Sequence, residues 1–375
     1  MAPPLKFKLF FFLLLVTNCF AQPMDYVRVQ IIQDAKSVSI KAAGSYEIND
    51  AGNRVLYRGR DLKTTATVFK GKVLLSNVYV GPNKVIISVS QPGEIIVNGR
   101  KFRGSIQFMI NDNDSFSVIN HIGLEDYIKG ILYHEVSHYW PEEALKAQAI
   151  VCRTYAVYQM RQNKNKDFDL TSDIYSQVYG GSTSERYRTN KAVRETEARV
   201  LVYRGKVFPA YFHATCGGHT EDASALWNID IVPLKGVPCN FCKNSPHFDW
   251  HYVSSLGELK DSLTKAGYNV GDINDILILG KDKTGRNREL KIISPQKEIK
   301  ISAKDFRNAV SPNLIKSTNF SVNLVNRDAV FEGFGWGHGV GLCQWGAYFM
   351  AKQGYKYGEI LKYYYPGSDV KTIGF

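Results

Sequence analysis

Residues 134–138 read H-E-V-S-H, which matches the H-E-x-x-H pattern of zinc peptidases. On a continuous helix the two histidines would face the same way and hold a zinc ion, and the glutamate would act as general base. Pro141 follows His138 by three residues, however, and a proline pushes the residue before it out of the helical region. We therefore expect the string to lie in a turn between two helices. A zinc peptidase remains an alternative that this break disfavours.

Glu135 is then the residue of this string that could do chemistry by itself. Tyr133, Tyr139 and Trp140 flank it, and a carboxyl in aromatic, partly dry surroundings has its protonated form favoured. Such a group can donate a proton to a leaving oxygen near neutral pH. Because aromatic rings also stack on sugar rings, the pattern indicates cleavage of a glycan. The alternative for a lone glutamate in a helix turn is a solvated cap.

Cysteine and histidine residues form a second candidate site further along the chain. His213 and Cys216 are followed by Cys239 and Cys242, and two residues separate the members of each pair. This spacing is typical of a structural zinc site, in which four protein ligands close the coordination sphere. In an exported protein the same thiols could instead form a Cys239–Cys242 or a Cys216–Cys242 disulfide.

The cysteine count limits the role of disulfides. Five of the six cysteines lie after residue 21, and an odd number rules out a complete disulfide framework in the mature chain. Cys152 lies in an apolar helical run and Cys343 in a glycine-rich turn, and we expect both to be packing residues.

The elements that must position these residues change type near residue 120. Residues 25–120 contain short alternating apolar runs between turn clusters, which predict a β-rich region without a catalytic constellation. From residue 121 the apolar spacing becomes helical, with one helix before Glu135 and a second from Pro141 to about Gln162. Strands follow near residues 200–213, and a glycine-rich loop with an amphipathic helix occupies residues 334–354. The predicted fold class is α+β.

The N-terminus and the net charge indicate an exported protein. Residues 1–21 have a basic start, an apolar stretch and a small-x-small end at Cys19-Phe20-Ala21, which is the pattern of a signal peptide. An uncleaved anchor and lipidation of Cys19 are the alternatives, and no other segment is apolar enough to span a membrane. The net charge of +12 favours anionic envelope polymers as partners over nucleic acid, because no basic block resembles a nucleic-acid arm.

Seven separated strings, in order, resemble the stage II sporulation protein D (SpoIID/LytB, amidase-enhancer) family. They are LEDYIKG at 124–130, EVS at 135–137, WPEEALKAQA at 140–149, CRTYA at 152–156, SDIYSQVYGG at 172–181, FHATCGGHTE at 212–221 and GWGHGVGLCQWGA at 335–347. The resemblance covers about residues 120–235 and 328–370. It implies a SpoIID-like catalytic domain of mixed helices and strands over residues 121–375, with an insertion at about 250–328, after a β-rich N-terminal domain over residues 22–120.

The resemblance further implies a peptidoglycan lytic transglycosylase in the periplasm or cell envelope. Such an enzyme cleaves the bond between N-acetylmuramic acid and N-acetylglucosamine to a 1,6-anhydro product, on glycan strands whose peptides a cell-wall amidase has removed. The family's catalytic glutamate falls on Glu135. Candidate substrate contacts are Tyr133, Trp140, Lys146, Gln148, Arg153, Ser176, Gln177, Tyr179, His338 and Gln344.

Two expectations accompany this hypothesis. Zinc in some relatives favours a structural site at His213, Cys216, Cys239 and Cys242, with no metal required for the chemistry. The competing function, from a different class, is a catalytically silent activator that binds glycan and a cell-wall amidase. Glu135 favours the enzyme, because a pure activator has no need of it.

Overall fold

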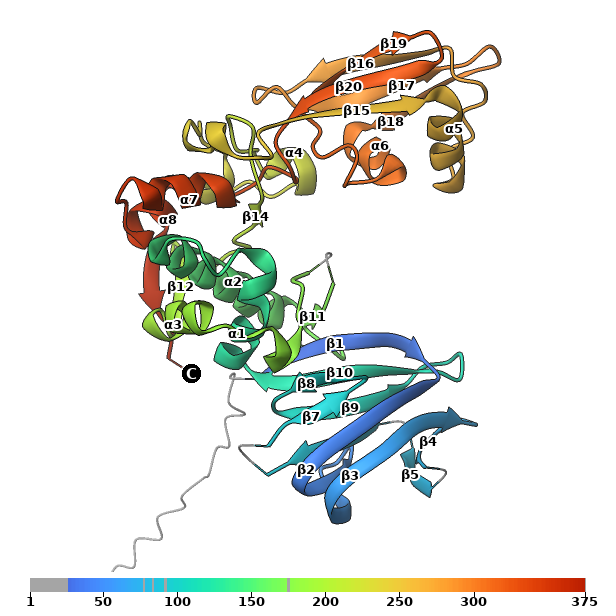
Figure 1. Ribbon diagram of the computed structural model, residues 1–375, viewed down its shortest axis with the longest axis vertical. Coiled ribbons are helices and arrows are strands. Elements are labelled where there is room, and N and C mark those ends of the chain that lie inside the picture. The colour runs from blue at the N-terminus through green and yellow to red at the C-terminus, as the bar shows by residue number, and fades with distance from the viewer. Residues whose placement is uncertain (1–25, 77, 83, 91–92, 174–175, 375) are drawn as a thin grey trace, which may run out of the picture.

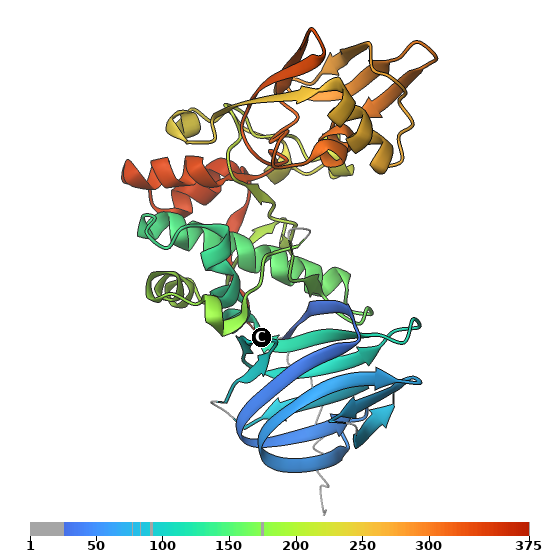
Figure 2. The same ribbon diagram turned by 45° about the vertical axis from the view of Figure 1, so that its right-hand side comes forward.

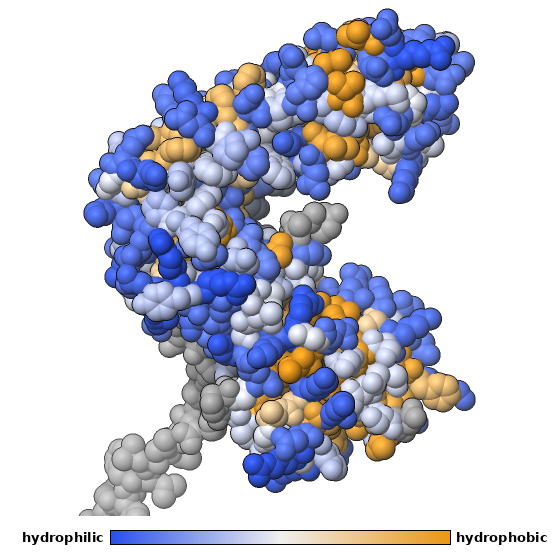
Figure 3. Space-filling view, in the orientation of Figure 1, coloured by the Kyte–Doolittle hydropathy of each residue, from blue (hydrophilic) through white to orange (hydrophobic). Residues whose placement is uncertain are grey.

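The computed structural model describes residues 26–374, apart from residues 77, 83, 91–92 and 174–175. The chain forms three parts arranged as an open C: a β-rich N-terminal part, a central helical part and an inserted part (Figures 1 and 2). The space-filling view shows a hollow between the two outer parts (Figure 3). The predicted α+β class with a β-rich N-terminal region is confirmed. The predicted signal peptide and Cys19 lie outside the described residues.

The N-terminal part is a large, mostly antiparallel sheet that buries one face. In β2, Val38, Ile40 and Ala42 are buried while the residues between them are exposed, as expected for a half-buried strand. The strand order is β11-β1-β10-β9-β6-β2-β3-β4-β5, and β7 pairs with β2 and β8. The bounds are β1 Tyr26–Ala35, β2 Ser37–Asp50, β3 Val55–Phe69, β4 Lys72–Leu75, β5 Val78–Pro82, β6 Lys84–Val89, β7 Ile95–Val97, β8 Arg100–Phe102, β9 Ser105–Ile110 and β10 Phe116–Gly123.

The central part is built around one long, buried helix, α2 (Glu142–Gln162). Every residue from Ala147 to Val157 is buried, because α2 contacts α1, α3, α7, α8 and β12. A helix enclosed in this way has no wide polar face. The other elements are α1 Leu124–Glu135, β11 Leu170–Thr171, η1 Gly181–Ser184, α3 Tyr187–Glu195, β12 Arg199–Tyr203, β13 Lys206–Val207, β14 Phe212–His213, α4 Ser224–Trp227, η2 Val232–Leu234, η3 Phe241–Asn244, β21 Leu342–Cys343, α7 Gln344–Lys352, α8 Tyr357–Tyr364 and β22 Asp369–Thr372.

The N-terminal sheet and the central helices share one hydrophobic core. Ile106 and Val118 of the sheet belong to the same buried cluster as Tyr127 and Ile131 of α1 and Leu145 of α2. In addition, β11 lies parallel to β1 at the edge of the sheet. The N-terminal part is therefore packed into the central part and is not a separately buried unit.

The inserted part has its own core, which contains Trp250, Phe306, Phe320 and Phe331. Two three-stranded antiparallel sheets, β15-β20-β19 and β16-β17-β18, enclose it together with α5 and α6. The bounds are β15 Asp249–Ser255, α5 Leu256–Lys265, β16 Asp275–Lys281, β17 Asn287–Ile293, β18 Glu298–Ser302, α6 Ala303–Val310, β19 Phe320–Val325 and β20 Asp328–Phe334. None of the helices in the described part of the chain has the length and hydropathy that a membrane crossing requires.

Candidate active site

The H-E-x-x-H string spans the end of one helix and the turn after it. Helix α1 ends at Glu135, because Val136 has an extended backbone (φ −143°, ψ 150°). Pro141 caps the start of α2. The predicted turn between two helices is therefore confirmed, and His138 lies outside the helix that carries His134. The Nε2 atom of His134 lies 2.5 Å from the Ser184 hydroxyl, while the His138 ring packs against Tyr139.

Glu135 opens into a cavity of about 510 Å³ formed mainly by segments distant in sequence. Its walls come from the end of α1, from α2, from the 176–178 loop, from β14 and α4, and from the glycine-rich segment that leads into α7. The lining residues are Glu135, Tyr155, Ser176, Val178, Tyr211, Phe212, His213, Ala214, Trp227, Trp336, Gly337, His338 and Gln344. Glu135 is the one carboxyl among the lining residues that the structure describes.

The surroundings of Glu135 favour its protonated form. Burial raises the pKa of Glu135 to about 7, against the opposing effect of a hydrogen bond from the backbone N–H of Val178. Part of the residue is still exposed to the cavity, so a ligand there can reach the carboxyl. The side-chain amide of Gln344 donates to the backbone oxygen of Glu135 at 3.2 Å and fixes the end of α1. A carboxyl with this pKa can give and take a proton near neutral pH.

Aromatic rings form much of the cavity wall. The rings of Tyr211 and Trp227 are stacked with centroids 4.2 Å apart, and Trp227 also meets His338 at 5.0 Å. Trp336 provides a further aromatic face. Tyr211 and Trp227 were not singled out from the sequence. Trp336 lies within the glycine-rich string at 335–347, and this position could have indicated that Trp336 belongs to the site.

Two neutral histidines border the cavity. The backbone occupies both nitrogens of His338 but only the Nδ1 atom of His213, whose buried Nε2 atom has no hydrogen-bond partner among the described residues. The Nδ1 atom of His338 accepts from the Val340 N–H at 3.0 Å, and its other nitrogen donates to the Phe212 backbone oxygen. Burial is the main reason why the pKa of His338 falls to about 3. The Nδ1 atom of His213 donates to the Val340 oxygen at 3.1 Å. His338 is thus part of the wall and has no nitrogen free for the sugar hydroxyl that it was expected to bind.

The structure brings Glu135, Ser176, His338 and Gln344 of the sequence-predicted residues to the cavity. Four others point into the protein interior. They are Gln148, Arg153, Gln177 and Tyr179, all buried.

Each of these buried side chains has a partner inside the protein. Arg153 forms an ion pair with Glu125 at 2.7 Å. The Gln177 amide oxygen accepts from Tyr127 at 3.1 Å, and the Tyr179 hydroxyl donates to Asn120 at 2.8 Å. Gln148 donates to the sulfur of Cys152 at 3.3 Å. The expectation of direct glycan contact is corrected for these residues, because their polar atoms stabilise the packing around α2.

Three further predicted contacts lie at the surface near the turn and do not line the cavity. The guanidinium carbon of Arg186 lies over the ring of Tyr133, 4.3 Å from the ring centroid. Trp140 packs against Trp345 at 5.1 Å and against Tyr348. Lys146 forms ion pairs at the start of α2, with Glu142 at 2.9 Å and Glu195 at 2.7 Å.

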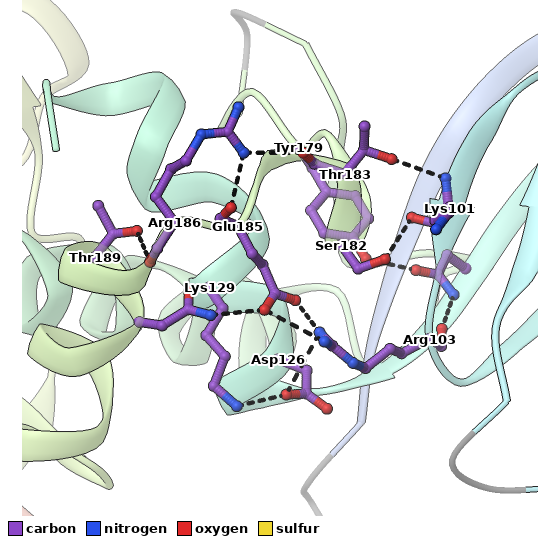
Figure 4. A network of polar contacts seen from close by, with 12 residues as sticks. Lys101, Arg103, Asp126, Lys129, Tyr179, Ser182, Thr183, Glu185, Arg186 and Thr189 are labelled. Carbon is purple, nitrogen blue, oxygen red and sulfur yellow. Dashed lines mark hydrogen bonds and ion pairs between the residues drawn. The ribbon is translucent and has the colours of Figure 1, made fainter.

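The N-terminal sheet holds the segment from Ser182 to Glu185 (Figure 4). This segment follows Val178, the hydrogen-bond donor to Glu135. The backbone N–H of Lys101 donates to Thr183 at 3.0 Å, and the Ser182 hydroxyl donates to the Lys101 oxygen at 3.3 Å. Arg103 forms an ion pair with Glu185, which follows this loop. The 176–185 segment is therefore held between the sheet and α1.

Four buried cysteines lie together behind the cavity. The Sγ atoms of Cys216, Cys239, Cys242 and Cys343 are all within 4.8 Å of one another, and those of Cys216 and Cys242 are 3.4 Å apart. The sulfurs of a tetrahedral Zn²⁺ site are about 3.8 Å apart, since Zn–S bonds are about 2.3 Å long. The cluster thus fits a zinc ion. The fourth cysteine of the cluster is Cys343, which the sequence predicts to be a packing residue. His213, the predicted fourth ligand, is not in the cluster.

Backbone groups hold the sulfur of Cys343 in place. It accepts from the N–H groups of Cys216 at 3.3 Å and Gly346 at 3.4 Å, at the start of α7. Burial and the neighbouring cysteines raise the pKa of the Cys343 thiol, so a bound metal would have to displace its proton. A residue with a side chain at position 346 would collide with the Tyr364 hydroxyl and approach Cys239, so glycine is required beside the cluster.

Comparisons with known proteins match two parts of the chain to family descriptions. The family described as Stage II sporulation protein matches residues 112–203, and a domain of unknown function (DUF8618) matches residues 239–341. The chain is 36% identical to an uncharacterized protein of Brachyspira hyodysenteriae over 347 residues, covering 92% of this chain and 93% of that protein.

Two relatives from Bacillus subtilis carry descriptive names. Stage II sporulation protein D is 29% identical over 67% of this chain and 75% of its own length. The amidase enhancer is 27% identical over 80% of this chain, which spans about half (49%) of that relative's length. The matched family segment contains Glu135, α1 and α2. On the motifs, the matched segment and these relatives, the chain belongs to the stage II sporulation protein D family.

Proposed function

We propose that this protein is an exported lytic transglycosylase that acts on peptidoglycan strands in the periplasm or cell envelope, with Glu135 as the acid and base. The observation that carries the proposal is a single carboxyl with a pKa of about 7 in an aromatic cavity. The names of the relatives, a sporulation protein and an amidase enhancer, support a role at the cell wall.

The proposed reaction uses one carboxyl twice. Protonated Glu135 donates its proton to the glycosidic oxygen as the bond from that oxygen to C1 of N-acetylmuramic acid breaks. The resulting carboxylate takes the proton of the C6 hydroxyl, whose oxygen forms a new bond to C1. The products are a 1,6-anhydro sugar and a free hydroxyl, and no water is consumed. Common glycosidases need two carboxyls about 5–10 Å apart. Glu135 is the one carboxyl among the described lining residues, which suits the intramolecular route.

Mass analysis of the products tests this function. The mature protein is incubated with glycan strands that lack peptides, beside Glu135→Gln and the control Glu197→Gln, which changes an exposed carboxyl. We expect anhydro-ended sugars from the wild type and from the control only. Products that carry an added water, or activity that survives in Glu135→Gln, would contradict the proposal.

The second candidate function is a non-catalytic activator of a cell-wall amidase, and the relative named amidase enhancer favours it. It predicts no cleavage of the strands by wild type or Glu135→Gln, together with faster peptide release when either protein is added to an amidase. The zinc peptidase predicts peptide release that His138→Ala abolishes. The separation of His134 and His138 by the helix end disfavours it.

We also propose that the four-cysteine cluster binds a structural zinc ion. A closed site with four thiolate ligands leaves no position for substrate, so the ion would stabilise the fold and take no part in the cleavage. It would join the loop after β14, the segment at η3 and the start of α7 behind the cavity wall. Elemental analysis with a thiol count tests this site. One zinc per chain is expected, and a disulfide without zinc would refute it.

A further inference from the structure

The inserted part lies next to one wall of the Glu135 cavity. Strand β20 ends at Phe334, and the chain continues directly into the lining residues Trp336 and His338. The segment before β19 lies alongside, since the Gly337 N–H donates to the backbone oxygen of Lys316 at 2.9 Å. Lys316 belongs to the inserted part, in the loop between α6 and β19, and is therefore next to the cavity wall.

The ammonium group of Lys316 is a cation beside the cavity wall. It lies over the ring of Trp336, 5.4 Å from the ring centroid. Among the residues that the structure describes, no carboxylate lies within ion-pair distance of Lys316, whereas fourteen other lysine and arginine side chains have such partners. The His247 ring meets the Trp336 ring edge to face, with centroids 4.6 Å apart. Burial, together with the positive charge of Lys316, lowers the pKa of His247.

A second cation, Arg307, contacts the loop that carries Lys316. The guanidinium of Arg307, on α6, donates to the backbone oxygens of Ile315 at 2.9 Å and Pro312 at 3.4 Å. The described residues place no carboxylate in ion-pair distance of it either. Its charge also reaches the cavity wall, where it helps to lower the pKa of His338. The inserted part thus presents excess positive charge beside a cavity whose described carboxyl is often protonated.

We propose that Lys316, with Arg307 behind it, forms a carboxylate-binding subsite that recognises the free lactyl carboxylate of N-acetylmuramic acid. This inference rests on the proposed function. The lactyl group carries a negative charge after its peptide has been removed, and it is a neutral amide while the peptide is attached. The inserted part, whose matched domain has no known function, would then select peptide-stripped strands by charge.

The test compares two forms of one polymer. Peptide-stripped strands are used directly, or after their carboxylates have been converted to neutral methylamides. Binding of both strands to Glu135→Gln is measured by calorimetry, and the rate of cleavage by the wild type at low substrate concentration is measured in parallel. We expect a preference of roughly tenfold for the charged strand, as for one charge-assisted contact at a partly exposed site. The preference should shrink at high salt.

Substitutions at Lys316 identify the subsite. Lys316→Ala should bring the ratio between the two strands close to one, and Lys316→Arg should retain most of it. Lys300→Ala removes an exposed lysine on β18 of the same part and should keep the full preference. Equal binding of both strands, or an unchanged preference in Lys316→Ala, would overturn the inference.

The binding measurement separates this inference from the proposed function. If the wild type cleaves neither strand but the charged strand binds tighter in a Lys316-dependent way, the transglycosylase proposal fails and the subsite stands. If both strands are cleaved equally and bind equally, the subsite fails and the transglycosylase stands.

Discussion

The side-chain amide of Gln344 donates to the backbone oxygen of Glu135 at 3.2 Å, across 209 residues of sequence. This bond connects the first residue of α7 to the last residue of α1. The C-terminal glycine-rich segment therefore positions Glu135, the proposed acid, at the end of α1. We expect Gln344→Ala to lower the rate of strand cleavage roughly tenfold with about 1 kcal/mol loss of stability. Gln353→Ala, at the exposed end of α7, is the control and should retain wild-type kinetics.

The pKa of Glu135 predicts how pH affects both the rate of cleavage and the stability of the folded protein. Donation needs the protonated carboxyl, so the rate should fall as the pH rises above about 7. The pKa is raised from 4.5 in the folded chain, so this group contributes stability that is present below pH 4.5 and is lost as the pH rises through about 7.

Glu135→Gln removes the cost of burying the ionised carboxyl. At pH 8 we expect the variant to be more stable than the wild type by about 3 kcal/mol, and at pH 4 the two should be equal. Denaturant unfolding at both pH values measures this difference. Equal stability at pH 8 would show that the carboxyl is not desolvated in the folded protein.

Arg153 is expected to be a structural residue, although the sequence motif placed it among candidate glycan contacts. Its guanidinium is fully buried and pairs with Glu125. Arg153→Met leaves a partly buried carboxylate unpaired and should cost about 3–5 kcal/mol of folding free energy. Arg161→Ala, at the exposed end of α2, should have little effect. A fully stable Arg153→Met with a raised KM would support the glycan contact instead.

Trp227 is expected to contribute to substrate binding through its stacked pair with Tyr211. Trp227→Ala should raise KM for glycan strands roughly tenfold, because it removes a large apolar contact area from the cavity. Tyr187→Ala, which truncates a 77% exposed ring, is the control. An unchanged KM for Trp227→Ala would place the sugar elsewhere.

The two proposed ligand sets for zinc make different predictions. Cys343→Ser should lower the zinc content and the thermal stability, because it removes one of four ligands. His213→Asn should keep the zinc, since the His213 ring bonds to the Val340 oxygen at the cavity. Cys152→Ala, outside the cluster, is the control. Loss of zinc in His213→Asn but not in Cys343→Ser would restore the original assignment.

The sequence predicted local features well. Pro141 marked the break between α1 and α2, and alternating apolar residues marked the N-terminal strands. The position of Glu135 at the helix end followed from the same proline. These features depend on neighbours in sequence, and backbone sterics and periodicity determine them.

Contacts between distant segments were not predictable in the same way. Arg153, Gln177 and Tyr179 stood in the same motifs as Glu135, yet their side chains turn toward the interior. Cys343 joins Cys216 because β21 pairs in parallel with β14, and no spacing rule reveals that pairing. Trp227 and Tyr211 line the same cavity as Glu135 although they are distant from it in sequence. Such neighbours are set by the tertiary fold.

The shared core and the Lys101 and Arg103 contacts have a consequence for how this protein can be divided. The matched family segment begins at residue 112, which lies between β9 and β10 of the N-terminal sheet. Cutting there would expose Tyr127 and Ile131 of α1 and release the segment from Ser182 to Glu185. The smallest unit that can fold around Glu135 therefore includes the strands from β1 onward, and the sheet cannot be removed as a separate domain.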